Sequence, residues 1–241
     1  RATGKTTIDA RGKVVAPGFI DVHTHFDEIA SHPGAEHFVR MGVTTVIAGN
    51  CGGSADDVAH AFATIEKSPV AINYATLVGH NTVRRAAMGT ARRAPTSAEL
   101  EKMQQLVTKA MRDGAVGFST GLQYVPGTYA NTDEVIALAR GFDVYSMNKY
   151  RWAPPKEFID KVYAIQKLPI LIGEFHFGVP ERGLAPGLVQ AMNQTERGVA
   201  YSYYVEHAAE HPAIIGTHWY QWIDQPVTGR FDGENYNIGW F

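Results

Sequence analysis

Three side chains in the first quarter of the sequence have the chemistry of metal ligands. His23 and His25 form the motif Val22-His23-Thr24-His25, which follows an apolar run over residues 15–21. Residues two apart in a strand face the same side, so the two imidazoles would point together. Cys51 lies in Gly49-Asn50-Cys51-Gly52, closely after the next apolar run. Neutral imidazole and thiolate suit Zn²⁺, so the pattern indicates a metal site, although taken alone the histidines could be strand-end polar groups and Cys51 a small buried apolar side chain.

A second motif, Leu171-Ile172-Gly173-Glu174-Phe175-His176, carries an acid at the end of an apolar run. A carboxylate buried without a partner is costly, which favours a site at the strand end over a purely structural role for Glu174. Strands of a (β/α)8 barrel present their chemistry in this way, at their carboxyl ends. The second motif therefore predicts a functional acid.

Both motifs require parallel strands to position them. Short apolar runs alternate with helix-like segments along the chain, which is typical of βα units in an α/β fold. The predicted strands are residues 18–23, 43–49, 71–79, 115–120, 142–148, 168–174 and 213–219. Seven strands are one fewer than closure of the common barrel requires, and residues 6–15 are a candidate for a further strand or small hairpin. The chain has 241 residues, close to the roughly 250 of a TIM-type barrel, and we predict one barrel domain over residues 1–241.

The predicted helices lie between these strands. Thr96-Ser97-Ala98-Glu99 has the form of a capping box, and apolar residues recur after it at helical spacing. A short helix is predicted to begin around Thr132, and another over residues 156–167, after Pro155. A longer amphipathic helix is predicted over about residues 186–209.

Further blocks accompany the histidine motif. They are residues 8–22, Gly42-Val43-Thr44-Thr45-Val46, Val78-Gly79-His80 and residues 117–127. Through these blocks residues 8–140 resemble the N-acyl-D-amino-acid deacylases, a branch of the metal-dependent amidohydrolase superfamily. The resemblance implies that His23, His25 and Cys51 are metal ligands, and it assigns no role to His80 or Tyr124. Such deacylases take further ligands from histidines on their fifth and sixth strands and a catalytic aspartate from the eighth, and the chain after Arg140 contains none of those motifs.

After Arg140 the motifs are of another kind. The blocks are residues 142–150, 169–178, 215–222 and 229–239. Through them residues 141–241 resemble agarase-type glycoside hydrolases, which also have a (β/α)8 barrel. The resemblance implies that Glu174 is the catalytic nucleophile of a retaining mechanism, in a sugar site with Asn148, His218 and Trp219, although core packing is the commoner role of a tryptophan. Retaining hydrolysis needs a second carboxyl group about 5–5.5 Å away, and the strand end where such enzymes carry it, residues 119–123, has no acid here.

The two resemblances together predict a chimeric TIM-type α/β barrel, with an amidohydrolase-like half over residues 1–140 and a glycoside-hydrolase-like half over 141–241. One hypothesis is a hydrolase with a partial zinc site that cleaves amide bonds such as those of N-acyl amino acids. In it Glu174, His176 or His218 would complete the coordination begun by the first half. A second hypothesis is a residual glycosidase or sugar-binding site centred on Glu174. The third is a chimeric scaffold without useful catalytic activity.

The composition excludes several other classes of protein. The net charge is −2 and lysine and arginine form no cluster, which argues against nucleic-acid partners. No apolar stretch approaches the roughly 20 residues of a membrane span, and a single cysteine excludes an internal disulfide. The expected partners are a small-molecule or oligosaccharide substrate and a second copy of the chain bound through open strand edges. No signal peptide is recognisable, and the first resemblance implies a cytoplasmic location.

Overall fold

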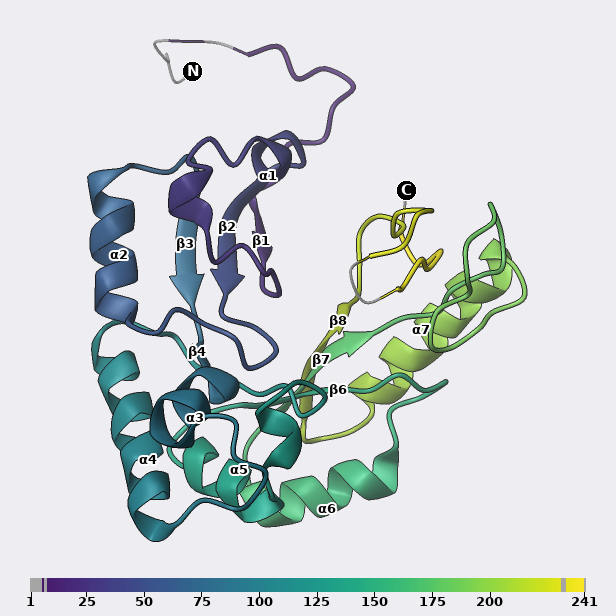
Figure 1. The fold of residues 1–241 in the computed structure, drawn as a ribbon. Coiled ribbons are helices and arrows are strands. Elements are labelled where there is room, and N and C mark those ends of the chain that lie inside the picture. The colour runs from purple at the N-terminus through teal and green to yellow at the C-terminus, as the bar shows by residue number, and fades with distance from the viewer. Residues whose placement is uncertain (1–5, 7, 231–232, 241) are drawn as a thin grey trace. The chain divides into compact units, whose positions relative to one another are not determined.

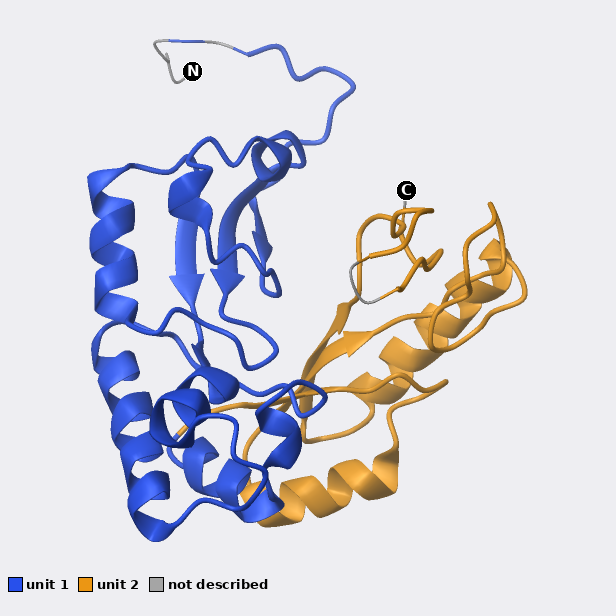
Figure 2. Cartoon of the chain, viewed as in Figure 1, with its two compact units in different colours: residues 1–141 blue, residues 142–241 orange. Residues whose placement is uncertain are grey.

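Short parallel strands connected by helices and loops make up the chain in the computed structural model, which describes residues 6, 8–230 and 233–240 (Figure 1). The chain divides into two compact units, Arg1–Gly141 and Phe142–Phe241 (Figure 2). The division falls beside Arg140, where the sequence motifs change. That the two units form a single barrel domain stays a prediction.

Unit 1, residues 1–141, carries two small parallel sheets. The first has the order β1 (Phe19–Asp21), β2 (Val43–Ala48) and β3 (Asn73–Thr76), and the second pairs β4 (Val78–Gly79) with β5 (Phe118–Ser119). Strand β2 is rich in β-branched residues, and Val43, Val46 and Ala48 are its buried side chains. Because the strands of a sheet run in one direction, their carboxyl ends meet at one edge, where His23 follows β1 and Cys51 follows β2.

Three of the five α-helices described in unit 1 begin at a side-chain cap. The helices are α1 (Glu36–Arg40), α2 (Val58–Lys67), α3 (His80–Met88), α4 (Ser97–Arg112) and α5 (Thr132–Ala139), with 3-10 turns η1 (Ile29–Ser31) and η2 (Gly127–Tyr129). The capping box predicted before α4 is confirmed: the Thr96 hydroxyl accepts from the Glu99 amide at 3.3 Å, and the Glu99 carboxylate accepts from the Thr96 amide at 2.7 Å. Asn131 caps α5 in the same manner, by accepting from the Glu134 amide.

Unit 2, residues 142–241, is built on one parallel sheet of β6 (Tyr145–Asn148), β7 (Ile170–Phe175) and β8 (Ile214–Trp219), in that order. Its helices are α6 (Lys156–Gln166) and α7 (Gln194–Ala209). Phe175 on β7 stacks on Tyr204 of α7 with ring centroids 4.1 Å apart, in a core that also buries Ile170 and Ile172. Among the described residues of both units, no helix is long and apolar enough to cross a membrane.

The structure corrects three details of the strand predictions. The run 71–79 forms two strands, β3 and β4, because the chain passes from pairing with β2 to pairing with β5 at Leu77. The described part of the chain therefore has eight strands instead of seven, and they pair in three separate sheets, not in one closed sheet. The described residues of the segment 6–15 form no strand; residue 7 lies outside the described residues.

The helix predicted over about 186–209 is wrong in its first third, since α7 begins only at Gln194. The preceding residues form a loop with one isolated bridge: Gly178 donates its amide to the Val189 carbonyl at 3.0 Å and accepts from the Ala191 amide at 2.8 Å. Asn193 then caps α7 through the Glu196 amide at 2.9 Å. Long-range backbone pairing has prevailed here over the local helical pattern.

Candidate functional site

The three predicted metal ligands of unit 1 lie together in space. One ligand atom from each of His23, His25 and Cys51 falls within 4.8 Å of the others. The Cys51 Sγ is 3.5 Å from the His23 Nε2, and the two imidazole rings are 5.6 Å apart in an edge-to-face arrangement. His25 is exposed, whereas His23 and Cys51 are half-buried. The cluster is therefore accessible from solvent on the side of His25.

Hydrogen bonds to β1 and β2 hold the backbone of the histidine segment. The His23 amide donates to the Asp21 carboxylate at 3.1 Å, and the Thr24 amide donates to the Ile47 carbonyl of β2 at 3.2 Å. Burial raises the pKa of the Asp21 carboxyl. The backbone between the two histidines is thus bonded to both β1 and β2.

The loop that carries Cys51 has an unusual backbone. Cys51 itself has a φ of 54°, between Gly49 at 76° and Gly52 at 83°. A left-handed conformation of a non-glycine residue costs about 1–3 kcal/mol and persists only where the surroundings enforce it. The buried Asn50 amide contributes by donating to the Ile47 carbonyl at 2.8 Å and to the Thr24 carbonyl at 3.2 Å.

The electrostatics of the cluster favour the ligating form of the cysteine. Burial by itself raises the pKa of the Cys51 thiol, but hydrogen bonds from His23 and His25 and their positive charge outweigh burial and lower it to about 7. The thiol is therefore partly ionised at neutral pH, and the thiolate is the form that binds metals.

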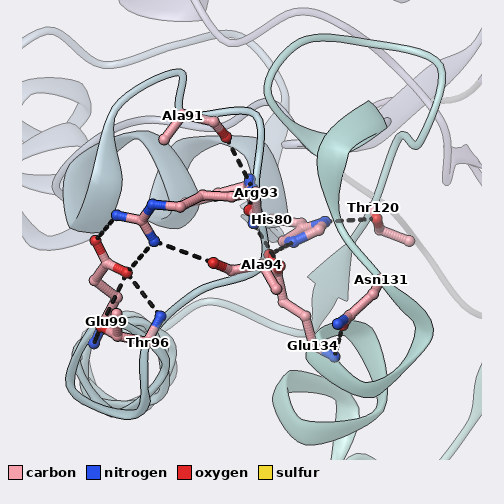
Figure 3. Close-up of polar contacts among 10 residues, drawn as sticks. His80, Ala91, Arg93, Ala94, Thr96, Glu99, Thr120, Asn131 and Glu134 are labelled. Carbon is pink, nitrogen blue, oxygen red and sulfur yellow. Dashed lines mark hydrogen bonds and ion pairs between the residues drawn. The ribbon is translucent and has the colours of Figure 1, made fainter.

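A buried ionic network in unit 1 is not predicted by the sequence analysis. The His80 Nδ1 is 2.9 Å from the Thr120 hydroxyl, and its Nε2 is 2.8 Å from one carboxylate oxygen of Glu134 (Figure 3). The other oxygen of Glu134 pairs with the Arg84 guanidinium, which also donates to the carbonyl of Arg93 at 2.8 Å. The side chains of His80, Arg84 and Glu134 are completely buried.

Two opposing effects act on the Glu134 carboxyl. Burial raises its pKa, but hydrogen bonds from His80 and Arg84 outweigh burial and lower it, so Glu134 is held as a carboxylate. The only sequence signal for this network is the i, i+4 spacing of His80 and Arg84 on one helix face. Glu134 lies 54 residues from His80, so its role could not be read from the sequence.

In unit 2, Glu174 lies at the end of β7 and is almost fully buried. The Tyr150 hydroxyl donates a hydrogen bond to its carboxylate. Asn148 at the end of β6 is the register partner of Glu174. Burial and the neighbouring Glu174 carboxylate raise the pKa of Tyr150, which keeps the phenol protonated as the donor.

Trp219, the last residue of β8, packs against the aromatic core of unit 2. Its ring contacts Phe175 and Tyr201, with centroids 5.3 and 5.6 Å away, and its indole N–H donates to the Ile238 carbonyl at 3.0 Å. The register of β7 and β8 is irregular between Ile172 and Phe175. The structure thus pairs Glu174 with Asn148 and packs Trp219 among aromatic residues, and a site shared by Glu174 and His218 stays a prediction.

His176, two residues after Glu174, is almost fully buried, and we expect it to make the stability of unit 2 depend on pH. Burial lowers the pKa of its imidazole to about 4, and the neutral ring accepts a hydrogen bond from the Leu188 amide at 2.9 Å. An unfolded histidine titrates near 6.5, so between pH 6.5 and 4 the unfolded chain binds a proton that the folded chain does not. We expect the free energy of unfolding to fall by about 3 kcal/mol as the pH is lowered through this window, at about 1.4 kcal/mol per pKa unit. Urea unfolding at a series of pH values measures this slope, and an unchanged slope in His176→Gln would contradict the assignment.

Comparison with known proteins places both parts of the sequence. The profile of the amidohydrolase family matches residues 6–168. A D-aminoacylase of Alcaligenes xylosoxydans xylosoxydans is 39% identical over 163 residues, which cover 58% of this chain and 34% of that enzyme. Beta-agarase B of a Vibrio species (strain JT0107) is 49% identical over 73 residues, which cover 30% of this chain and 8% of that enzyme. The chain therefore shares sequence with both groups of enzymes that its motifs resemble.

The solved structures agree with the first of these relationships. The N-acyl-D-glutamate deacylase of Bordetella bronchiseptica, solved with zinc and a phosphonate inhibitor, matches with a TM-score of 0.67 and 31% identity, over 90% of this chain and 50% of that one. A crystal structure of D-aminoacylase gives a TM-score of 0.62 at 25% identity, over 86% of this chain and 48% of that one. The chain spans about a third of the length of the curated deacylases that it matches. With a family match over residues 6–168 and a mixed α/β fold like that of these enzymes, the chain belongs to the amidohydrolase family.

Proposed function

We propose that this protein binds a zinc ion through His23, His25 and Cys51 and acts as a hydrolase on amide bonds of N-acyl amino acids. The observation that carries the proposal is the grouping of the three ligand atoms within 4.8 Å, where β1 and β2 end. The sequence relationship to enzymes named D-aminoacylase and N-acyl-D-glutamate deacylase supports the choice of substrate.

The donor atoms fit zinc in type and spacing. A nitrogen and a sulfur bonded to one tetrahedral zinc, at about 2.1 and 2.3 Å, are about 3.6 Å apart. The His23 Nε2 and the Cys51 Sγ are 3.5 Å apart. Zinc sites built for catalysis have three protein ligands and keep one position for water or substrate, which matches a cluster of three that is open on the side of His25.

The chain's own residues hold this cluster in place for the reaction. When bound, zinc supplies a Lewis acid that polarises a carbonyl and lowers the pKa of water toward about 7. Asp21 orients the backbone of His23, and Asn50 ties the cysteine loop to the histidine segment. The thiol of Cys51, with a pKa of about 7, can lose its proton to become a ligand without a large change in pH.

Metal content and hydrolysis together test the proposal. The protein is loaded with zinc and dialysed against metal-free buffer, and its metal content is measured by elemental mass spectrometry. We expect close to one zinc per chain. The zinc protein is then assayed for release of free amino acid from N-acetyl-D-amino acids, with chelator-treated protein as the control. Absence of retained zinc would contradict the metal site, and retained zinc without hydrolysis would contradict only the amidase activity.

A second function, a sugar site or weak glycosidase in unit 2, is favoured by one observation. The buried Glu174 carboxylate is held by the Tyr150 hydroxyl at a strand end, in a chain related to β-agarases. We propose that the Glu174 carboxylate is the nucleophile of this site.

Turnover on agarose oligosaccharides is expected to be near background, because the strand end of residues 119–123 supplies no acid/base partner. Any residual release of reducing sugar should disappear in Glu174→Gln, which preserves shape and removes the charge. Asp143→Asn, a matched change of a carboxylate in the same unit, should leave it unaltered. Strong glycosidase turnover that persists in Glu174→Gln would show that the acid has another role.

A further inference from the structure

The hydroxyl of Ser119, the last residue of β5, spans the loop that carries Cys51. It accepts a hydrogen bond from the Gly52 amide at 2.9 Å and donates one to the Gly49 carbonyl at 2.5 Å. Gly49 and Gly52 flank the two residues Asn50 and Cys51. The Ser119 side chain, 67 residues from Gly52 and 70 from Gly49 in sequence, thus bonds the loop on both sides of the cysteine.

Close contact between backbones leaves no room for the loop to shift toward β5. A Cβ atom on Gly121 would lie 2.0 Å from the Cys51 carbonyl oxygen. A Cβ on Gly79 would lie 2.3 Å from the Gly52 carbonyl oxygen, which also accepts the Asn81 amide at the start of α3. The backbone of the cysteine loop is therefore packed directly against the ends of β4 and β5, and glycine is needed at both contact points.

The residue after Ser119 anchors this end of β5 in the buried ionic network. The Thr120 hydroxyl bonds the His80 Nδ1, and the opposite side of that ring bonds Glu134 (Figure 3). Since His80 and Glu134 are completely buried, the end of β5 is attached to the interior of unit 1. Ser119 therefore acts from a fixed position.

We propose that Ser119 is a positioning residue for the third metal ligand. Its two hydrogen bonds hold Gly49 and Gly52 together, and so keep Cys51 at a φ of 54° with its thiol 3.5 Å from the His23 Nε2. This inference rests on the proposed metal site. Groups behind a metal ligand that orient it typically change metal affinity by about 10- to 100-fold when they are removed.

The test compares three variants with the parent. Ser119→Ala removes the hydroxyl, and Ser119→Thr keeps it. Ser54→Ala is the matched control, because its half-buried hydroxyl belongs to the same loop but bonds the Gly79 amide and the Ala55 carbonyl, neither of which flanks Cys51. Zinc affinity is measured by competition with a chromophoric chelator, and cobalt loading reports the sulfur–metal bond through its near-ultraviolet absorption. Hydrogen exchange of the Gly52 amide, without metal, reports the loop itself.

We expect Ser119→Ala to bind zinc about 10- to 100-fold more weakly, to lose much of the cobalt–sulfur absorption, and to exchange the Gly52 amide faster. Ser119→Thr should restore all three values, and Ser54→Ala should stay within about twofold of the parent affinity. Parent-like affinity and absorption in Ser119→Ala, or an equal loss in Ser54→Ala, would overturn the proposal. If the parent binds no metal, the metal site is wrong, and unchanged Gly52 exchange would separately show that Ser119 does not hold the loop.

Discussion

Replacing His23 and His25 together with alanine is expected to abolish stoichiometric zinc binding. The two imidazoles supply two of the three clustered ligand atoms, and the Cys51 thiolate alone cannot fix a metal that sites of this kind hold by at least three ligands. Metal bound only to the folded state stabilises it, by about 2.7 kcal/mol when free zinc is a hundredfold above the dissociation constant. Zinc should therefore raise the melting temperature of the parent by about 5–10 °C and leave that of the double variant unchanged.

One exposed and one half-buried histidine provide the matched control for this experiment. His60 on α2 and His207 on α7 lie outside the cluster, and replacing both with alanine removes the same number of imidazoles. Metal analysis and thermal melts with and without zinc are then compared across the three proteins. Equal zinc content in His23→Ala/His25→Ala and in the parent would refute the ligand assignment.

Glu134→Ala is expected to destabilise unit 1 by about 3–5 kcal/mol. Removal of one partner of a buried ion pair leaves the other charge without compensation, which is among the most costly single changes in a protein. Here the Arg84 guanidinium and the His80 ring would both lose their carboxylate partner in a fully buried environment. Urea unfolding followed by circular dichroism measures the loss.

An exposed ion pair in the same unit provides the control for the effect of burial on this loss of stability. Glu36 and Arg40 are paired at 3.7 Å on the surface of α1, and Glu36→Ala should change stability by less than about 1 kcal/mol. Replacing Arg84 as well as Glu134 with leucine should recover part of the loss, because no buried charge is then left unpaired. A Glu134→Ala variant as stable as Glu36→Ala would show that the network contributes little.

The positions of the strands could be predicted from the sequence because they depend on local patterns. Every predicted strand has an observed strand inside or overlapping it, and the capping box at Thr96 and Glu99 fixes the start of α4. The first third of the helix predicted over 186–209 failed because its backbone pairs with residues around Gly178, and no local pattern contains that information. Local sequence patterns thus predict where the strands and helices lie, whereas long-range backbone pairing determines where the α7 helix begins.

The candidate site divides in the same way. His23 and His25 could be found because they stand two apart directly after an apolar run, and Cys51 because it lies in a motif after the next run, although both histidines follow β1 and do not lie in it. The sequence does not predict the left-handed backbone of Cys51. It also does not predict that the Ser119 hydroxyl closes the loop, since 67 residues separate Ser119 from Gly52. Local spacing thus pointed to the three candidate ligands, whereas contacts between distant segments determine how the loop of Cys51 is held.

The supports of the cysteine loop have a consequence for protein engineering. The groups that hold the Cys51 loop come from β2, the start of α3 and the end of β5. The end of β5 is in turn bonded through His80 to Glu134 of α5. A designer who grafts the two histidines and the cysteine onto another parallel βα scaffold would transfer the donor atoms without the geometry of the third. The shortest segment that would carry this candidate site together with its supports runs from β1 to α5 and includes Gly79 and Gly121.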